Sequence, residues 1–107
     1  MTSKQRAYLM HLASDLDPIF QIGKASVTPE FVEAVSEAFN KRELIKISVL
    51  NNCMDDPKEL AHTVAGRTRS QVVQVIGNKF ILYIENKANK KIILPLEIDP
   101  EIAGYQF

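Results

Sequence analysis

The sequence predicts a single compact α/β domain with the element order α-β-α-β-α-β-β. Three segments repeat apolar residues at helical spacing, and short runs of branched apolar residues lie between them. The last two runs are separated only by Gly77-Asn78, a pair typical of a two-residue β-hairpin. Alternating strands and helices imply parallel strands with helices covering the sheet, and the hairpin adds an antiparallel edge. We therefore expect a four-stranded mixed sheet with packed helices, and 107 residues suffice for its core.

The first two elements follow from spacing and from a proline. Apolar side chains recur at helical spacing within residues 2–15, and Asp17-Pro18 ends this pattern. The apolar run 18–22 predicts the first strand.

The second helix has a clear start. Thr28 is suited to the N-cap position and Pro29 to the first helical position. One face of this helix is apolar and consists of Val32, Val35, Ala38 and Phe39. The strand that follows contains Leu44, Ile45, Ile47, Val49 and Leu50.

The third helix is bounded by a proline and a glycine. A polar loop from Asn51 leads to Pro57, which begins the helix, and Gly66 is expected to end or kink it. The hairpin strands are then predicted over 71–76 and 79–84.

Charge is distributed unevenly along a chain whose net charge is zero. Segment 66–91 carries six basic residues against one acidic residue, a sum of +5, while 54–65 sums to −2 and 92–107 to −3. Residues 1–53 hold six of each sign. Local charge sets the field that a ligand meets. Two interpretations of this charge distribution stay open. The basic segment is part of an anion-binding surface, or it is a solvated surface followed by an acidic tail.

A tight basic loop, Gly23-Lys24-Ala25-Ser26, joins the first strand to the second helix. This arrangement aims free backbone N–H groups, the positive end of a helix dipole and one lysine at the same point. Such a point attracts phosphate.

The chain contains no residue set that predicts catalysis. His11 and His62 lie in predicted helices without partners at ligand spacing, so we expect each to be a surface or half-buried residue. Cys53 cannot form an intrachain disulfide and is expected to be an inert loop thiol. Asp55-Asp56 precede a proline and suit turn and capping positions better than a cation site. We expect no enzyme, catalytic residue, metal, cofactor or small-molecule substrate.

The expected location is the cytoplasm. The chain is 46% hydrophobic and 24% charged, like an average globular protein. No stretch approaches the roughly 20 apolar residues of a membrane span. Residues 1–6 are polar, unlike a secretory signal. We expect a monomer without membrane contact.

Several short motifs follow one another in a fixed order. They are Lys-Gln-Arg-x-x-Leu from residue 4, Pro-Ile-Phe-Gln-Ile-Gly-Lys from 18, Thr-Pro from 28, Arg-Glu-Leu-Ile-Lys-Ile from 42, Val-Gln-Val-Ile-Gly from 73, Leu-Tyr from 82 and Ile-Leu-Pro from 93. This succession, over residues 2–95, resembles the YhbY/YqeI-like bacterial family, whose members consist of a stand-alone CRM domain.

The resemblance implies a fold similar to the C-terminal domain of translation initiation factor three. It also implies RNA binding and association with ribosomal RNA in precursors of the large ribosomal subunit. It places a CRM domain at 1–95 and leaves 96–107 as an acidic C-terminal extension.

The family's RNA-binding loop has the pattern Gly-x-x-Gly, comparable to the loop of KH domains that clamps the nucleic-acid backbone. The resemblance places its first glycine on Gly23, its variable pair on Lys24 and Ala25, and its last glycine on Ser26, where this sequence departs from the pattern. Glycine there would permit a positive φ and close approach of a phosphate. Serine disfavours a positive φ but offers a hydroxyl donor. We therefore expect the loop to bind RNA with altered geometry or more weakly.

Four further basic residues are candidates for RNA contacts. Lys4 and Arg6 would flank the loop if the start of the first helix lies nearby. Arg67 and Arg69 offer forked donors suited to phosphates. Three others are at least as well explained by helix-surface ion pairs with Glu37 and Glu43: Lys41, Arg42 and Lys46. Two hairpin aromatics are expected in the core rather than stacked on bases: Phe80 and Tyr83.

Two rival functions stay open. A protein-interaction adaptor would dock the acidic end, with Glu97, Asp99 and Glu101, on a basic partner. Deleting 96–107 discriminates, since lost partner binding would support the adaptor and tighter RNA binding would indicate a tail that mimics RNA. A nucleotide-binding domain has the least support, because nothing resembles a base or Mg²⁺ site.

Overall fold

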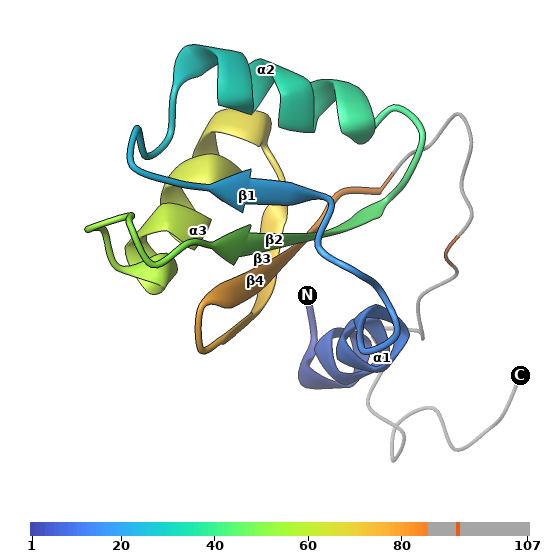
Figure 1. The fold of residues 1–107 in the computed structure, drawn as a ribbon. Helices are drawn as coiled ribbons and strands as arrows, with labels where there is room; N and C mark the ends of the chain where they lie inside the picture. Colours follow the sequence, from blue (N-terminus) through green and yellow to red (C-terminus); the bar gives the residue numbers. More distant parts are fainter. Residues whose placement is uncertain (86–91, 93–107) are drawn as a thin grey trace, which may run out of the picture.

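Three helices and four strands follow one another in the part of the chain that the structure describes, residues 1–85 and 92 (Figure 1). In this computed structural model they are α1 (Ser3–Ala13), β1 (Phe20–Ile22), α2 (Pro29–Ala38), β2 (Leu44–Val49), α3 (Pro57–Thr68), β3 (Gln71–Ile76) and β4 (Lys79–Tyr83). The predicted order is confirmed. The acidic extension 96–107 and the Ile-Leu-Pro motif at 93–95 lie outside the described residues.

The strands form one mixed sheet in the order β1-β2-β4-β3. β1 and β2 are parallel, as predicted. The second strand–helix–strand unit differs from the prediction, because β4 lies between β2 and β3 and pairs antiparallel with both. Four successive residues of β4, from Phe80 to Tyr83, are buried, whereas β3 is mostly half-buried or exposed. A strand that is buried on both faces belongs in the centre of a sheet, so β3 takes the edge.

The predicted helix starts are confirmed, but one predicted stop is wrong. Asp56 caps α3, since its Oδ1 accepts a hydrogen bond from the Lys58 N–H at 3.4 Å. The helix continues through Gly66, where a helical glycine costs only about 1 kcal/mol relative to alanine. It ends at Arg69, whose φ of +61° turns the chain away while its N–H donates to the Ala65 carbonyl.

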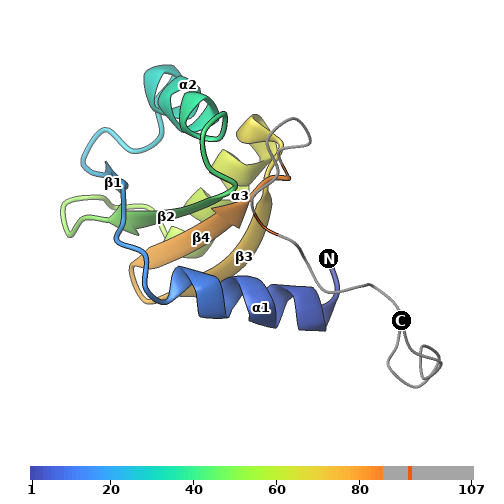
Figure 2. The same ribbon diagram turned by 90° about the vertical axis from the view of Figure 1, so that its right-hand side faces the viewer.

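Helices cover both faces of the sheet, with α2 and α3 on one face and α1 on the other (Figure 2). Successive residues of β2 alternate between these faces: Ile45 and Ile47 join the core under α2 and α3, and Leu44 joins the core under α1. Phe80 belongs to the larger core and Tyr83 to the smaller one, so both are core residues as predicted.

Candidate nucleic-acid interface

The loop between β1 and α2 forms a single tight turn. The Ser26 N–H donates to the Gly23 carbonyl at 2.9 Å. Lys24 and Ala25 occupy the tip of this turn and are both exposed. The turn therefore presents one lysine and the backbone around it to solvent at the carboxyl end of β1.

Ser26 adopts the backbone conformation that glycine favours, with φ at +59°. A left-handed conformation costs a non-glycine residue about 1–2 kcal/mol. The Ser26 hydroxyl donates a hydrogen bond to Oδ2 of Asp55, in the loop that follows β2. The serine thus keeps the positive φ at the last position of the loop, and its side chain ties the loop to a neighbour.

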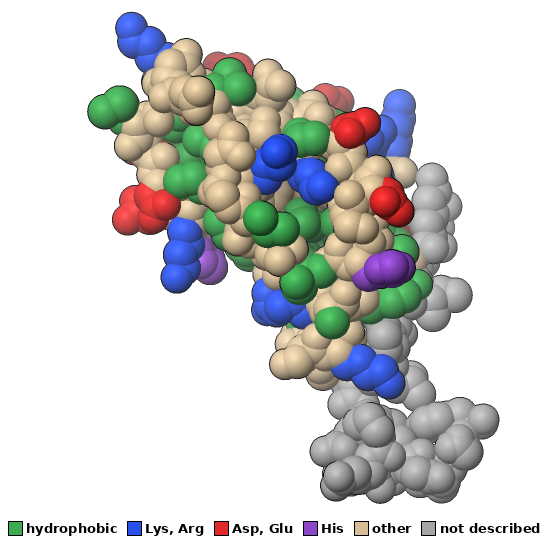
Figure 3. Space-filling model, turned by 60° about the horizontal axis from the view of Figure 1, so that its bottom comes forward, with side chains coloured by type: hydrophobic (Ala, Val, Ile, Leu, Met, Phe, Trp, Pro, Cys, Tyr) green, Lys and Arg blue, Asp and Glu red, His purple; other side chains and the backbone are tan. Residues whose placement is uncertain are grey.

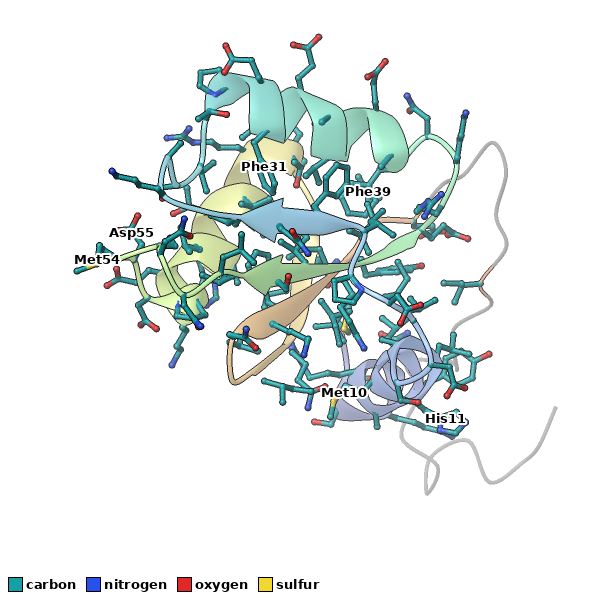
Figure 4. All side chains as sticks on the ribbon, viewed as in Figure 1. Met10, His11, Phe31, Phe39, Met54 and Asp55 are labelled. Carbon is teal, nitrogen blue, oxygen red and sulfur yellow. The ribbon has the colours of Figure 1, made fainter. Side chains whose placement is uncertain are left out.

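The loop after β2 packs directly against this turn. The Leu50 N–H donates to the Ile22 carbonyl at 2.8 Å, which extends the pairing of the two strands into their loops. A Cβ added at Gly23 would lie 3.4 Å from Oδ1 of Asn52. Figure 4 shows Asp55 and Met54 at this same end of the molecule. Sequence reasoning missed Asn52 and Asp55 as neighbours of the turn, although the parallel pairing of β1 and β2 brings their following loops to one edge.

The start of α2 offers fewer donors than an uncapped helix. Pro29 has no N–H, and the Phe31 N–H donates to Oγ1 of Thr28 at 3.1 Å. The Val32 N–H donates to the Thr28 carbonyl. Glu30 adds a negative charge in the first turn. The predicted convergence of free N–H groups at this helix end is therefore weaker than expected, and Lys24 is the main attraction for an anion.

Arg6 lies far from the turn. Its Nη1 donates to the carbonyls of Val72 and Val73, both at 2.8 Å. These residues form an irregularity in β3, the edge strand opposite β1. The condition for Lys4 and Arg6 to flank the loop is therefore not met, because the first turn of α1 lies beside β3.

Arg67 and Arg69 also lie away from the turn. α3 begins next to the loop that follows β2 and runs to the opposite end of the sheet, where Arg69 ends it (Figure 1). There Arg69 lines a hollow of about 150 Å³ with Met1, Gln5 and Tyr83. The predicted contact residues therefore do not converge: the turn 23–26 follows β1 at one edge of the sheet, Arg6 lies over β3 at the other edge, and Arg69 lines the hollow beside Tyr83.

Lys46 differs from the two residues with which the sequence grouped it. Lys41 and Arg42 lie in the turn after α2, whereas Lys46 lies in the middle of β2. The prediction of a helix-surface ion pair is therefore wrong for Lys46.

Comparison with known proteins identifies the family. The sequence profile of the CRS1 / YhbY (CRM) domain matches residues 1–83. The chain belongs to this family. The chain is 46% identical over 95 residues to "Probable RNA-binding protein YqeI" of Bacillus subtilis, covering 89% of this chain and 99% of that protein. It is 28% identical to a Haemophilus influenzae protein named "RNA-binding protein", covering 89% and 95% of the two chains.

A solved structure supports the fold of the CRM domain. The solution structure of the hypothetical protein SAV1595 from Staphylococcus aureus matches with a TM-score of 0.76 at 48% identity. The match covers 89% of this chain and 99% of that one.

The described part of the chain, residues 1–85 and 92, brings no three His, Cys, Asp or Glu side chains together as a metal site. His11 and His62 are exposed on their helices, as expected. Within the same residues, none of the helices has the length and apolar character needed to cross a membrane.

Tyr83 has an unusual environment in the hollow beside Arg69. Its hydroxyl is buried and has no hydrogen-bond partner among the described residues. Burial raises the pKa of Tyr83, and the carboxylates of Glu43 and Glu85 raise it further. The neutral phenol is therefore favoured in the folded state.

Replacing Tyr83 by phenylalanine should leave stability at pH 7 unchanged or raise it by up to about 1 kcal/mol, because a buried hydroxyl without a partner is removed. The raised pKa means that the wild type keeps its full stability below the unfolded-state pKa of about 10 and loses stability as pH rises further. Tyr83→Phe has no phenol to ionise, so it should lose less stability than the wild type as pH rises above about 10. Urea unfolding of both proteins at pH 7 and pH 11 measures the difference. A loss above 1 kcal/mol at pH 7 would contradict the prediction.

Proposed function

We propose that this CRM domain is a non-enzymatic RNA-binding module that holds the RNA backbone with the turn 23–26. One observation carries the proposal: the turn exposes Lys24 at its tip and reaches a positive φ at Ser26. A loop of this form suits the clamping of a nucleic-acid backbone. The names of the relatives, which describe RNA binding, support the same function.

The RNA in this proposal is ribosomal RNA of large-subunit precursors, and the domain assists their assembly in the cytoplasm. The support is the likeness to the YhbY/YqeI-like family. The exposed turn at one edge of the sheet also suits a partner that presents a folded backbone.

Salt dependence tests the RNA-binding part. Affinity for a large-subunit ribosomal RNA fragment should fall as salt rises from 50 to 200 mM, because each phosphate contact contributes about 0.7–0.9 to the slope of log affinity against log salt. For each phosphate contact, this rise in salt therefore lowers affinity about 2.6-fold or more. Binding that does not change with salt would contradict the proposal.

Sedimentation tests the ribosomal part. Extracts fractionated on a sucrose gradient should contain the protein with large-subunit precursors rather than with mature ribosomes. An unrelated structured RNA of the same length is the matched control in the binding assay, and equal affinity for it would argue against a ribosomal target.

A further inference from the structure

α1 covers only part of its face of the sheet. The core under α1 includes Leu44, Ile81 and Tyr83, which lie toward the start of β2. Toward the end of β2, one residue from each of the four strands lies in a row on the same face. The row consists of Gln21, Ser48, Lys79 and Ile76. The next row toward α1 consists of Lys46, Ile81 and Gln74, and only its middle residue, Ile81, belongs to the core under α1. We call these residues the open face: Gln21, Lys46, Ser48, Gln74, Ile76 and Lys79.

The open face carries two positive charges and no negative one. Lys46 and Lys79 lie on neighbouring strands as diagonal neighbours, since Lys79 is two residues from Ile81, the partner of Lys46. Lys79 is exposed and Lys46 is half-buried. Figure 3 shows basic side chains together in the middle of this side of the molecule. Like charges at this spacing repel, so an anion that bridges them would be stabilised.

The open face connects the turn with Arg6. Gln21 begins the first row, and Lys24 follows three residues later at the same edge of the sheet. At the other edge, the exposed Arg6 lies over the Val72 and Val73 carbonyls. The strands between these edges span about 14 Å, at about 4.8 Å per neighbouring pair. Basic groups are therefore spaced along a path that crosses the whole sheet.

The chemistry of the open face favours the backbone of a nucleic acid over its bases. The accessible side chains of this face are lysines, amides and one isoleucine, Ile76 at 54% exposure, whereas Ser48 is buried beneath them. Its aromatic neighbour Phe80 points to the opposite side, into the core under α2 and α3. Stacking of bases requires aromatic platforms, whereas lysines follow phosphates.

We propose that the open face binds the sugar-phosphate backbone of the same RNA that the turn 23–26 holds, with Lys46 and Lys79 as the phosphate contacts. This inference rests on the proposed function and extends it to a second surface. It makes Lys46 a contact residue, and it leaves Arg67 and Arg69 outside the RNA path.

Substitutions of single lysines test the proposal. Lys46→Gln and Lys79→Gln should each weaken binding to the ribosomal RNA fragment about five-fold at 0.1 M salt, and the double variant about 25-fold, because each contact contributes about 0.7 to the salt slope. Lys58→Gln is the matched control, since Lys58 is an exposed lysine on the first turn of α3. A double variant that binds as tightly as Lys58→Gln would overturn the proposal.

Lysine footprinting tests the same surface in the unaltered protein. Acetylation by an N-hydroxysuccinimide ester, read by mass spectrometry, should be slowed by the RNA fragment at Lys24, Lys46 and Lys79, and not at Lys58. Protection of Lys24 alone would overturn the open face while supporting the turn. Protection of none of them would overturn the proposed function itself. Stronger protection of Lys46 and Lys79 by polyglutamate of equal charge than by RNA would indicate an acidic protein partner and overturn the RNA assignment.

Discussion

Replacing Lys24 by glutamate should weaken RNA binding about 25-fold at 0.1 M salt. The lost phosphate contact contributes a factor of about five, since it removes about 0.7 from the salt slope. The new carboxylate repels the same phosphate by about 1 kcal/mol at 4 Å in water, a further factor of about five. Fluorescence anisotropy with a labelled ribosomal RNA fragment measures both the affinity and the slope.

Two further variants at the turn separate charge from backbone geometry. Lys24→Gln should show only the first factor of five. Ser26→Gly should preserve or improve binding, because glycine adopts the φ of +59° at Ser26 without strain, although it loses the bond to Asp55. An affinity of Lys24→Glu within two-fold of the wild type would contradict the assignment of the turn.

The effect of Lys24→Glu should be confined to binding. Lys24 is exposed at the tip of the turn and contributes no side chain to either core. Surface substitutions of this kind change the free energy of unfolding by less than about 0.5 kcal/mol. Equal urea midpoints for the two proteins would show that the loss of affinity comes from the lost contact.

The features that the sequence predicted correctly depend on local chemistry. Thr28 and Pro29 begin α2 because a hydroxyl cap and a residue without an N–H suit the first turn of any helix. Gly77 supports the hairpin because its φ of +56° is easily adopted by glycine. Asp56 caps α3, as its place directly before a proline in the sequence indicated. Each of these signals spans a few residues.

The features that the sequence did not predict depend on residues far apart in the chain. The position of β4 between β2 and β3 follows from competition for the buried centre of the sheet. The bond from Ser26 to Asp55 joins residues 29 positions apart, and Arg6 bonds to carbonyls 66 and 67 positions away. These contacts hold the turn 23–26 and Arg6 at opposite edges of the sheet. No local pattern encodes them.

Replacing Phe80 by alanine should lower the free energy of unfolding by about 3–5 kcal/mol, the usual cost of such a cavity in a core. Phe80 is fully buried in the central strand β4, opposite Ile47 and Val75. A domain of this size has a total stability of about 5–15 kcal/mol, so the variant should be close to its unfolding threshold, with a Tm at least about 12 °C lower. Thermal unfolding followed by circular dichroism measures this shift.

Ile76→Ala on the adjacent strand is the control. Because Ile76 is 54% exposed, its replacement should lower the free energy of unfolding by less than about 1 kcal/mol. Similar losses for the two variants would contradict the place of Phe80 at the centre of the core that supports both the turn and the open face.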